Sequence, residues 1–410
     1  MKACILAAGE GKRLSPITDN RPKHMIRVAG KPLLEHTIER LKINGITDIL
    51  IVVGFKKEQI IDYFKDGSKL NVKISYIEQT EFSGTANAAY YAKHFAKNDP
   101  FMLIYGDLLV DMQIFGRCIE RFNKKDTDAV ISLFEVPDPQ KYGIINLDTN
   151  GFVKRIVEKP ETNEFGNLAN AGVYIFSPKI FEGIEKTPKS KRGEYEITDA
   201  MQILVDEGYK IAGVNVSGLY WSDVGHPWQL LEANQYIMDS IKRDISKEAI
   251  LEDFVVIKGE VIIEKGATIK SGSYIEGPAI IGEHSILGPQ CYIRPYTSIG
   301  PNCHIGNSTE VKASIILENT NAAHLSYIGD SIIGANVNIG AGTKFANVRL
   351  DKKEIALIIK GTRVNTMRKK LGAVVGDNAS IGINVSVMPG RKIGIGKFVM
   401  SGTVVDKDIE

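Results

Sequence analysis

Residues 257–269 read IKGEVIIEKGATI, and every sixth position in this stretch is aliphatic. The spacing continues without a miss as far as residue 317. A period of six fits neither one face of a helix nor one alternating strand. It is typical of a parallel β-helix of hexapeptides, in which each sixth side chain points into a narrow prism. The repeating positions are Ile257, Ile263, Ile269, Ile275, Ile281, Leu287, Ile293, Ile299, Ile305, Val311 and Leu317.

The repeat then stutters, is interrupted, and resumes close to the end of the chain. Residues 344–371 break the spacing and carry nine Lys or Arg against two acidic residues. Such a segment is expected to be an excursion from one corner of the prism. The later repeating positions are Ile328, Ile333 and Ile339, followed by Val375, Ile381, Val387, Ile393, Val399 and Val405.

The first half of the chain has a different pattern, in which short aliphatic runs alternate with helical stretches. This alternation predicts a mostly parallel sheet covered by helices, with ligands bound beyond the carboxyl ends of the strands. We expect a domain over residues 1–227, a connecting helix over 228–248 and the β-helix over 249–410. The expected strands lie at 3–7, 49–53, 74–77, 102–105 and 130–134, with helices at 32–44 and 86–95.

The composition of the chain argues against nucleic acid and membranes as partners. A formal net charge of +2 gives no general field for nucleic acid or a membrane surface. The four cysteines form no Cys-x-x-Cys pair, and no apolar run is long enough to span a bilayer. We therefore expect a reduced, cytoplasmic protein whose partners are small anionic molecules rather than nucleic acid or membrane.

Two glycines directly after the first strand indicate a phosphate site. Gly9 and Gly11 allow the backbone to fold closely around a phosphate, while Arg13 and Lys23 add positive charge. The spacing is not that of a Walker loop, and Leu14 stands where a dinucleotide fingerprint needs a third glycine.

Two carboxylates in later loops suggest a metal site. Asp107 follows the strand that ends at residue 105, and Asp223 lies in the sequence WSDVG. Two acids together with nucleotide phosphates are the usual way in which proteins hold Mg²⁺. Between them lie Gly143, the pair Glu158-Lys159 and Asn170, which could hold a sugar and its phosphate.

These motifs together resemble sugar-1-phosphate nucleotidylyltransferases over essentially all of residues 1–227, which implies a Rossmann-like α/β domain. The resemblance implies transfer of a nucleotidyl group from a triphosphate to a sugar phosphate, with Arg13 and Lys23 neutralising the triphosphate. It also implies that Asp107 and Asp223 hold Mg²⁺. The nucleotide-binding residues would be Leu6, Ala8, Gly9, Gly11, Gln79, Gly84 and Thr85, and the sugar-phosphate residues Gly143, Glu158, Lys159 and Asn170.

Polar residues of the repeat suggest a second site. A stacked coil brings residues about eighteen apart into register, so Arg294 and Lys312 should lie one above the other. Two unpaired stacked cations would bind an anion. His324 follows near a neighbouring corner, where an imidazole can act as a base near neutral pH.

The strings around these residues resemble the acetyltransferase half of the bifunctional GlmU family, which implies a left-handed β-helix and acetyl-CoA as co-substrate. By this resemblance Arg294, Lys312, Tyr327 and Asn338 would bind the amino-sugar phosphate, and His324 would accept a proton from its amine. The family's assembly implies a homotrimer with its clefts between subunits. The positions that would meet CoA are Ala341 and Ser401.

The chain departs from the bacterial pattern in ways typical of archaeal bifunctional enzymes. Asn347 stands for the family asparagine, and the lysine that should follow could be Lys352, Lys360 or another. Ile383 occupies a position where the family has a small residue near CoA. The expected product is a UDP-N-acetylhexosamine. UTP or dTTP, and glucosamine or galactosamine 1-phosphate, stay open, as does a single-activity transferase whose β-helix is a trimerisation or regulatory scaffold.

Overall fold

The computed structural model describes residues 1–158 and 160–410. It divides into two compact units, one of Met1–Gly9 with Leu34–Asp223 and one of Glu10–Leu33 with Val224–Glu410. Residues 10–33, which carry the phosphate-loop cations, therefore pack in the same unit as the β-helix.

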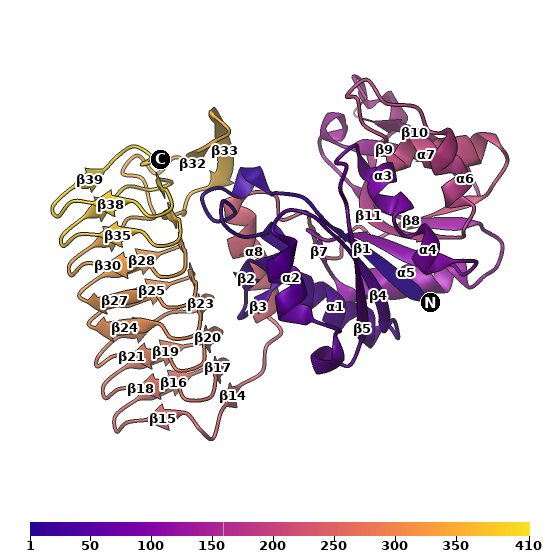
Figure 1. Ribbon diagram of the computed structural model, residues 1–410. Helices are drawn as coiled ribbons and strands as arrows, with labels where there is room; N and C mark the ends of the chain where they lie inside the picture. The colour runs from indigo at the N-terminus through magenta and orange to yellow at the C-terminus, as the bar shows by residue number, and fades with distance from the viewer. Residues whose placement is uncertain (159) are drawn as a thin grey trace. The chain divides into compact units, whose positions relative to one another are not determined.

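The first unit is built on a nine-stranded sheet with the order β10-β9-β11-β6-β1-β4-β5, and β8 and β12 lie off this path (Figure 1). The predicted buried runs form the parallel strands β1 (Lys2–Ala7), β4 (Asp48–Val53), β5 (Lys73–Glu78) and β6 (Phe101–Tyr105). The sheet is less parallel than expected, because β11 (Leu168–Phe176) runs antiparallel to both β6 and β8 (Ala129–Glu135). The remaining strands are β9 (Gly143–Leu147), β10 (Val153–Glu158) and β12 (Ile211–Asn215).

Helices form where the apolar spacing predicts them. The stretch expected at 32–44 is α1 (Leu33–Ile43). The stretch expected at 86–95 is two helices, because the Ala92 amide donates to Ala89 three residues back and tightens the chain there. The others are α2 (Lys57–Phe64), α3 (Thr85–Tyr90), α4 (Lys93–Ala96), α5 (Met112–Phe122), α6 (Ile180–Lys186) and α7 (Ile197–Asp206).

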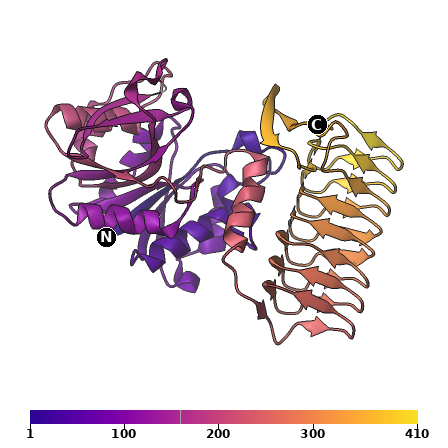
Figure 2. The ribbon, with the colours of Figure 1, turned by 180° about the vertical axis from the view of Figure 1, so that it is seen from behind.

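The second unit contains a left-handed parallel β-helix, in which three eight-stranded parallel sheets form the faces of a prism (Figure 2). One face runs β14 (Asp244–Ile245), β17 (Val261–Ile263), β20 (Ala279–Ile281), β23 (Thr297–Ile299), β26 (Ile315–Ile316), β29 (Ile332–Ile333), β34 (Val374–Val375) and β37 (Lys392–Ile393). The next runs β15 (Ile250–Leu251), β18 (Thr268–Ile269), β21 (Ile286–Leu287), β24 (His304–Asn307), β27 (Asn321–His324), β30 (Asn338–Ile339), β35 (Ser380–Ile381) and β38 (Phe398–Val399). The last runs β16 (Val256–Lys258), β19 (Tyr274–Glu276), β22 (Tyr292–Ile293), β25 (Glu310–Lys312), β28 (Tyr327–Gly329), β31 (Lys344–Phe345), β36 (Ser386–Val387) and β39 (Val404–Val405). We call them the first, second and third faces. Each coil crosses them in that order.

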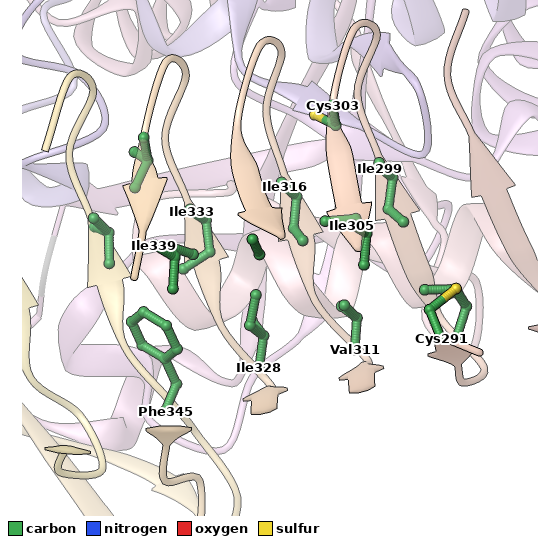
Figure 3. Packing of buried hydrophobic residues seen from close by; sticks show 14 of the residues in the cluster. Cys291, Ile299, Cys303, Ile305, Val311, Ile316, Ile328, Ile333, Ile339 and Phe345 are labelled. Atoms are coloured by element: carbon green, nitrogen blue, oxygen red, sulfur yellow. The ribbon is translucent and has the colours of Figure 1, made fainter. Parts of the chain in front are cut away.

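The hexapeptide residues fill the prism. Ile281 pairs with Ile263 and Ile299 on the neighbouring coils, and each of the three is at most 1% exposed. Figure 3 shows the labelled side chains gathered in the shared interior, with Phe345 as the largest. Burial of each aliphatic side chain stabilises the stack by about 1.5–3 kcal/mol.

The six-residue spacing ends one position earlier in the structure than the sequence indicates. Ile316, not Leu317, pairs with Ile299 and Ile333, so the prediction for Leu317 is wrong. Ile316 follows Val311 by five positions, whereas Ile299 follows Ile293 by six. The corner after β25 is therefore one residue shorter, and these coils contain seventeen residues in place of eighteen.

The basic excursion is confirmed, and it is ordered. It leaves the prism after Phe345 and forms an antiparallel hairpin of β32 (Ile355–Ile359) and β33 (Thr362–Arg368). The register then resumes with Val375 above Ile333. Arg368 forms an ion pair of 3.0 Å with Glu232 of α8 (Pro227–Met238). This helix is shorter than the connecting helix expected over 228–248, because β14 of the first face already begins at Asp244.

Candidate active sites

A cavity of about 310 Å³ lies at the carboxyl ends of β1, β5 and β6 in the first unit. This is where a sheet of this kind binds its ligands. Six predicted nucleotide residues line it, namely Leu6, Ala8, Gly9, Gln79, Gly84 and Thr85. Asp107 also lines it, as do Phe82, Tyr105 and Glu194, for which no role was expected.

The loop at Gly84 requires a glycine. Its φ is +120°, and a side chain there would collide with the backbone of Tyr195. The Ala86 amide donates to the Tyr195 carbonyl at 2.8 Å, and the Ile197 amide donates to Thr85 Oγ1 at 2.9 Å. The nucleotide loop is thus fixed to residues 195–197.

A smaller cavity of about 220 Å³ shares Thr85 and Tyr105 with the first. Gly143, Glu158 and Asn170 line it, as predicted for a sugar-phosphate site. Lys159 lies outside the described residues. A Cβ at Gly143 would lie 2.7 Å from Glu158 Oε2, so the glycine leaves room for that carboxylate.

Arg192 is the cation in this cavity that received no role from the sequence. It pairs with Glu196 at 2.6 Å and with Glu158 at 3.3 Å. The sequence feature that could have indicated Arg192 is the basic run KSKR, which only Gly193 separates from the acidic run EYEITD.

Beneath the cavity, Asn170 belongs to a buried hydroxyl network. Its Nδ2 donates to Tyr174 Oη at 2.6 Å, and its Oδ1 accepts from the Gly172 amide at 2.9 Å. Tyr174 in turn lies 2.9 Å from Tyr105 Oη. Burial raises the pKa of Tyr105 to about 12, so this hydroxyl stays neutral and can hydrogen-bond a ligand.

The two predicted phosphate-binding cations lie in the second unit, each against a glycine. Gly11 has a φ of +73°, and a Cβ there would lie 2.9 Å from Lys23 Cβ. A Cβ at Gly225 would lie 2.7 Å from Arg13 Nη2. Both glycines therefore leave the space that these long side chains occupy.

The two predicted metal carboxylates lie at the same end of a small sheet in the first unit. Strand β13 (Trp221–Ser222) pairs antiparallel with β7 (Leu109–Val110), and Ser222 lies opposite Leu109. This register brings Asp223 to the end of the sheet next to Asp107. Residues 1–158 and 160–410 contain no group of three or more metal-binding side chains. Two carboxylates suit a cation that also binds substrate phosphates.

A polar cluster covers the third face of the prism where the coils contain seventeen residues. Arg294 Nη1 donates to Glu310 Oε1 at 2.9 Å, and Lys312 Nζ donates to Asp330 Oδ2 at 2.8 Å. The expectation that these cations are unpaired is therefore wrong, although their stacking is confirmed by the pairing of Ile293 with Val311. The hydrogen bond from Arg294 to Glu310 raises the pKa of the guanidinium.

Tyr327 and Asn347 complete this cluster. Asn347 Nδ2 donates to the same Asp330 Oδ2 that Lys312 contacts. A Cβ at Gly329 would lie 2.5 Å from Tyr327 Oη and 2.8 Å from Asn347 Nδ2. Burial, with the charges of Asp330 and Glu310, raises the pKa of Tyr327. The tyrosine is therefore a neutral hydrogen-bonding group.

His324 lies at the next corner, at the end of β27 (Asn321–His324), and is exposed. The pairing of Asn321 with Asn338 places Ala341 one coil above His324. The same register continues through Ile383 to Ser401. His324 and the two predicted CoA residues thus form one column, while Asn338 lies exposed on the adjoining second face.

Comparisons with known proteins match both halves of the chain. A family model described as nucleotidyl transferase matches residues 2–240, and one described as the GMPPB C-terminal domain matches 275–370. The bifunctional protein GlmU of Methanocaldococcus jannaschii is 48% identical over 410 residues, covering 100% of this chain and 96% of that protein. A bifunctional sugar-1-phosphate nucleotidylyltransferase/acetyltransferase of Sulfurisphaera tokodaii is 41% identical and covers 100% and 98%.

The chain belongs to the bifunctional GlmU family. It is therefore a nucleotidyltransferase and an acetyltransferase, and the alternative of a single activity with a scaffold β-helix is not favoured. A glucose-1-phosphate thymidylyltransferase structure from Bacillus anthracis superposes with a TM-score of 0.52 at 31% identity, covering 57% of this chain and 94% of that one.

Membership in the GlmU family fits the chemistry of both regions. The family implies sugar-phosphate and nucleotide substrates, a divalent metal and acetyl-CoA. The two carboxylates suit the metal, which when bound would offset phosphate charge. None of the helices in residues 1–158 and 160–410 is long and apolar enough to cross a membrane.

Three basic residues of the excursion of this GlmU-family chain have defined surroundings. Lys360 lies at the tip of the β32–β33 hairpin, where it lines a cavity together with Lys12 and Arg13. Arg368 is paired with Glu232 of α8. Lys344, by contrast, donates to the carbonyls of Leu325 and Gly342 and braces the corner beside His324.

Proposed function

We propose that the chain makes a UDP-N-acetylhexosamine in two steps, at two separate sites. Acetyl-CoA first acetylates a hexosamine 1-phosphate at the β-helix, and a uridylyl group from UTP is then joined to the product at the first unit. The observation that carries this proposal is the polar cluster of Arg294, Lys312 and Tyr327 on the coils that also present His324. A scaffold would need none of these groups.

In the first step Arg294 and Lys312 bind the sugar phosphate through charge-assisted hydrogen bonds. Tyr327 and Asn338 orient the amino sugar, while Ala341 and Ser401 lie against CoA. The amine attacks the thioester carbonyl, so that a C–N bond forms and the C–S bond breaks. His324 accepts the amine proton, and the CoA thiol leaves.

In the second step the sugar-phosphate oxygen attacks the α-phosphate of UTP, and the bond to pyrophosphate breaks. Little covalent help is needed, so positioning and charge neutralisation dominate. Arg13 and Lys23 neutralise the triphosphate, and Gly143, Glu158, Lys159 and Asn170 hold the sugar phosphate. Asp107 and Asp223 would hold Mg²⁺, whose charge offsets that of the phosphates.

We further propose that the protein is a cytoplasmic homotrimer whose acetyl sites lie between neighbouring prisms. In one chain His324 and Lys312 occupy different corners, so a cleft between subunits would bring them together. Large apolar side chains flank the His324 column, with Leu325 58% exposed and Met400 77% exposed. Such an exposed stripe suits contact with a second copy. The proposed domains are 1–227 and the β-helix expected over 249–410, joined by residues 228–248, of which only the part up to Met238 is helical.

Separate single substitutions test the two activities. His324→Ala should abolish CoA release from acetyl-CoA and glucosamine 1-phosphate while pyrophosphate release from UTP and the N-acetylated sugar phosphate stays intact. Lys23→Ala should do the reverse. Loss of both activities in one folded variant would contradict separate sites.

Mixed oligomers test the shared cleft. His324→Ala and Lys312→Ala chains, each inactive alone, should regain part of the acetyl transfer when unfolded and refolded together. Inactive mixtures that are trimeric by light scattering would exclude a site shared between subunits.

A substrate panel then decides the open choices. UTP and dTTP should be compared, each with glucosamine 1-phosphate and galactosamine 1-phosphate, and the products scored by mass. No CoA release with either amino sugar would refute the acetyl step while leaving the nucleotidyl transfer standing.

A further inference from the structure

The segment 10–33, which carries Arg13 and Lys23, is fastened to the β-helix at two places. At its far end the Ala29 amide donates to Asn234 Oδ1 at 2.8 Å, and the Gly30 amide donates to Ser298 Oγ at 3.2 Å. Asn234 belongs to α8, and Ser298 belongs to β23 of the first face. The second place is at Asn20 and Arg21.

Asp377 is the acceptor at this second place, on the first coil after the excursion. Its Oδ1 accepts the Ala335 amide of the coil below at 2.9 Å, which fixes the carboxylate. Its Oδ2 accepts from Asn20 Nδ2 at 2.8 Å and forms an ion pair with Arg21 Nη2. The side chains of Arg21 and Asp377 are only 11% and 3% exposed. Glu318 adds a second carboxylate 3.6 Å from Arg21 Nη1.

A buried ion pair of this kind fixes a position more than it adds stability. Two desolvated charges repay their lost hydration only in good geometry, and removing one leaves the other buried and uncompensated. Arg21 is turned toward the β-helix, although its place in the sequence RPK suggests a role at the phosphates. Its guanidinium is therefore used as an anchor.

The anchor is joined to Lys23 by a short and stiff connection. Pro22 restricts the backbone between them, and its carbonyl accepts the Met25 amide at 2.9 Å in the turn that begins at Lys23. Lys23 also packs closely against Gly11, as the 2.9 Å approach to a Cβ there shows. A displacement of Arg21 would therefore also displace Lys23.

We infer that Asp377 is a positioning residue for nucleotidyl transfer, which holds Lys23 in place through Arg21 although it lies in the β-helix. The inference rests on the proposed role of Lys23 at the triphosphate. Misplacing a charged group by about 1 Å costs roughly 10²-fold in rate. The β-helix would thus contribute to the reaction assigned to the other unit.

The test uses Asp377→Asn in the full-length protein. The amide keeps an oxygen for Ala335 but loses the charge that holds Arg21. We expect kcat for pyrophosphate release to fall about 10- to 100-fold with little change in KM for UTP. Acetyl transfer should be unchanged, because Asp377 lies at a different corner from His324. Hydrogen exchange should become faster in residues 10–33.

Asp408→Asn is the matched control. Asp408 is another buried carboxylate of the β-helix, which accepts the Lys392 amide at 2.9 Å and lies 3.9 Å from Lys392 Nζ. Asp408 does not bond to residues 10–33 as Asp377 does, so both activities should stay intact in Asp408→Asn. Arg21→Lys should recover part of the rate lost in Arg21→Met, since it keeps the charge without the fork of donors.

Three results would overturn the inference. One is an unchanged kcat in Asp377→Asn and Arg21→Met. Another is a parallel fall of both activities in these variants, which would mean general damage to the fold. The third is an equal loss in Asp408→Asn. If Lys23→Ala itself retains nucleotidyl transfer, the proposed role of Lys23 fails first, and this result is distinct from the other three.

Discussion

Replacing Gly329 with alanine tests whether Tyr327 must keep its place for acetyl transfer. The new Cβ would lie 2.5 Å from Tyr327 Oη, where ordinary contact begins near 3.4 Å. The hydroxyl must therefore retreat by about 0.9 Å, and a displacement of about this size costs roughly 10²-fold in rate. We expect kcat/KM for acetyl transfer to fall by that order while nucleotidyl transfer is unchanged.

The assay follows the two activities in the same preparation. The CoA thiol released from acetyl-CoA reports acetyl transfer, and pyrophosphate reports nucleotidyl transfer. Gly394→Ala is a suitable control, because a Cβ there meets nothing closer than the Ile409 carbonyl at 3.2 Å. Full acetyl transfer in folded Gly329→Ala would refute the reasoning, as would an equal loss of both activities.

Three other predictions concern the core, the histidines and the metal. Ile305→Ala, at a fully buried position of the prism, should lower the free energy of unfolding by about 2–5 kcal/mol in denaturant titrations. Burial, and to a smaller extent the charges of Lys270 and His324, lower the pKa of His304. The His304 imidazole therefore binds a proton less tightly in the folded chain than in the unfolded chain. Stability should therefore fall as pH drops from 6.5 through the folded pKa, and His304→Gln should flatten that slope in urea titrations on either side of this pH. Asp107→Ala should abolish the stimulation of pyrophosphate release by Mg²⁺ while acetyl transfer persists, and an unchanged metal titration would exclude this carboxylate as a ligand.

The architecture was predictable because its hydrophobic pattern is local and regular. Each coil places one repeating aliphatic side chain per face in the core, so a period of six in the sequence becomes a ladder in the structure. The error at Leu317 has the same origin. A corner can lose one residue at little cost, and the neighbouring Ile316 then enters the core. Because Ile315, Ile316 and Leu317 are all aliphatic, the spacing in the sequence does not reveal this shift of one residue.

The sites were predictable in part. Glycines and carboxylates that follow strands predict the edge of the sheet where a ligand binds, and Gly9, Gly84 and Asp107 line one cavity there, with Gly143 and Glu158 in the other. The positions of Arg192 and Tyr105 in the cavities could not be predicted, because basic residues in loops and tyrosines at strand ends are common outside active sites. The pairing of Lys312 with Asp330 could not be predicted from a period of eighteen, because the coil there contains seventeen residues and Lys312 lies opposite Gly329, the neighbour of Asp330.

The assignment of residues 10–33 to the β-helix unit bears on how relatives of this chain can be recombined. A hybrid joined at residue 227 would bring together an Arg21 and an Asp377 of different ancestry. Our inference predicts that such hybrids lose nucleotidyl transfer unless both partners are exchanged as a pair. Natural recombination at that junction should have been restrained in the same way, so the two halves would be inherited together.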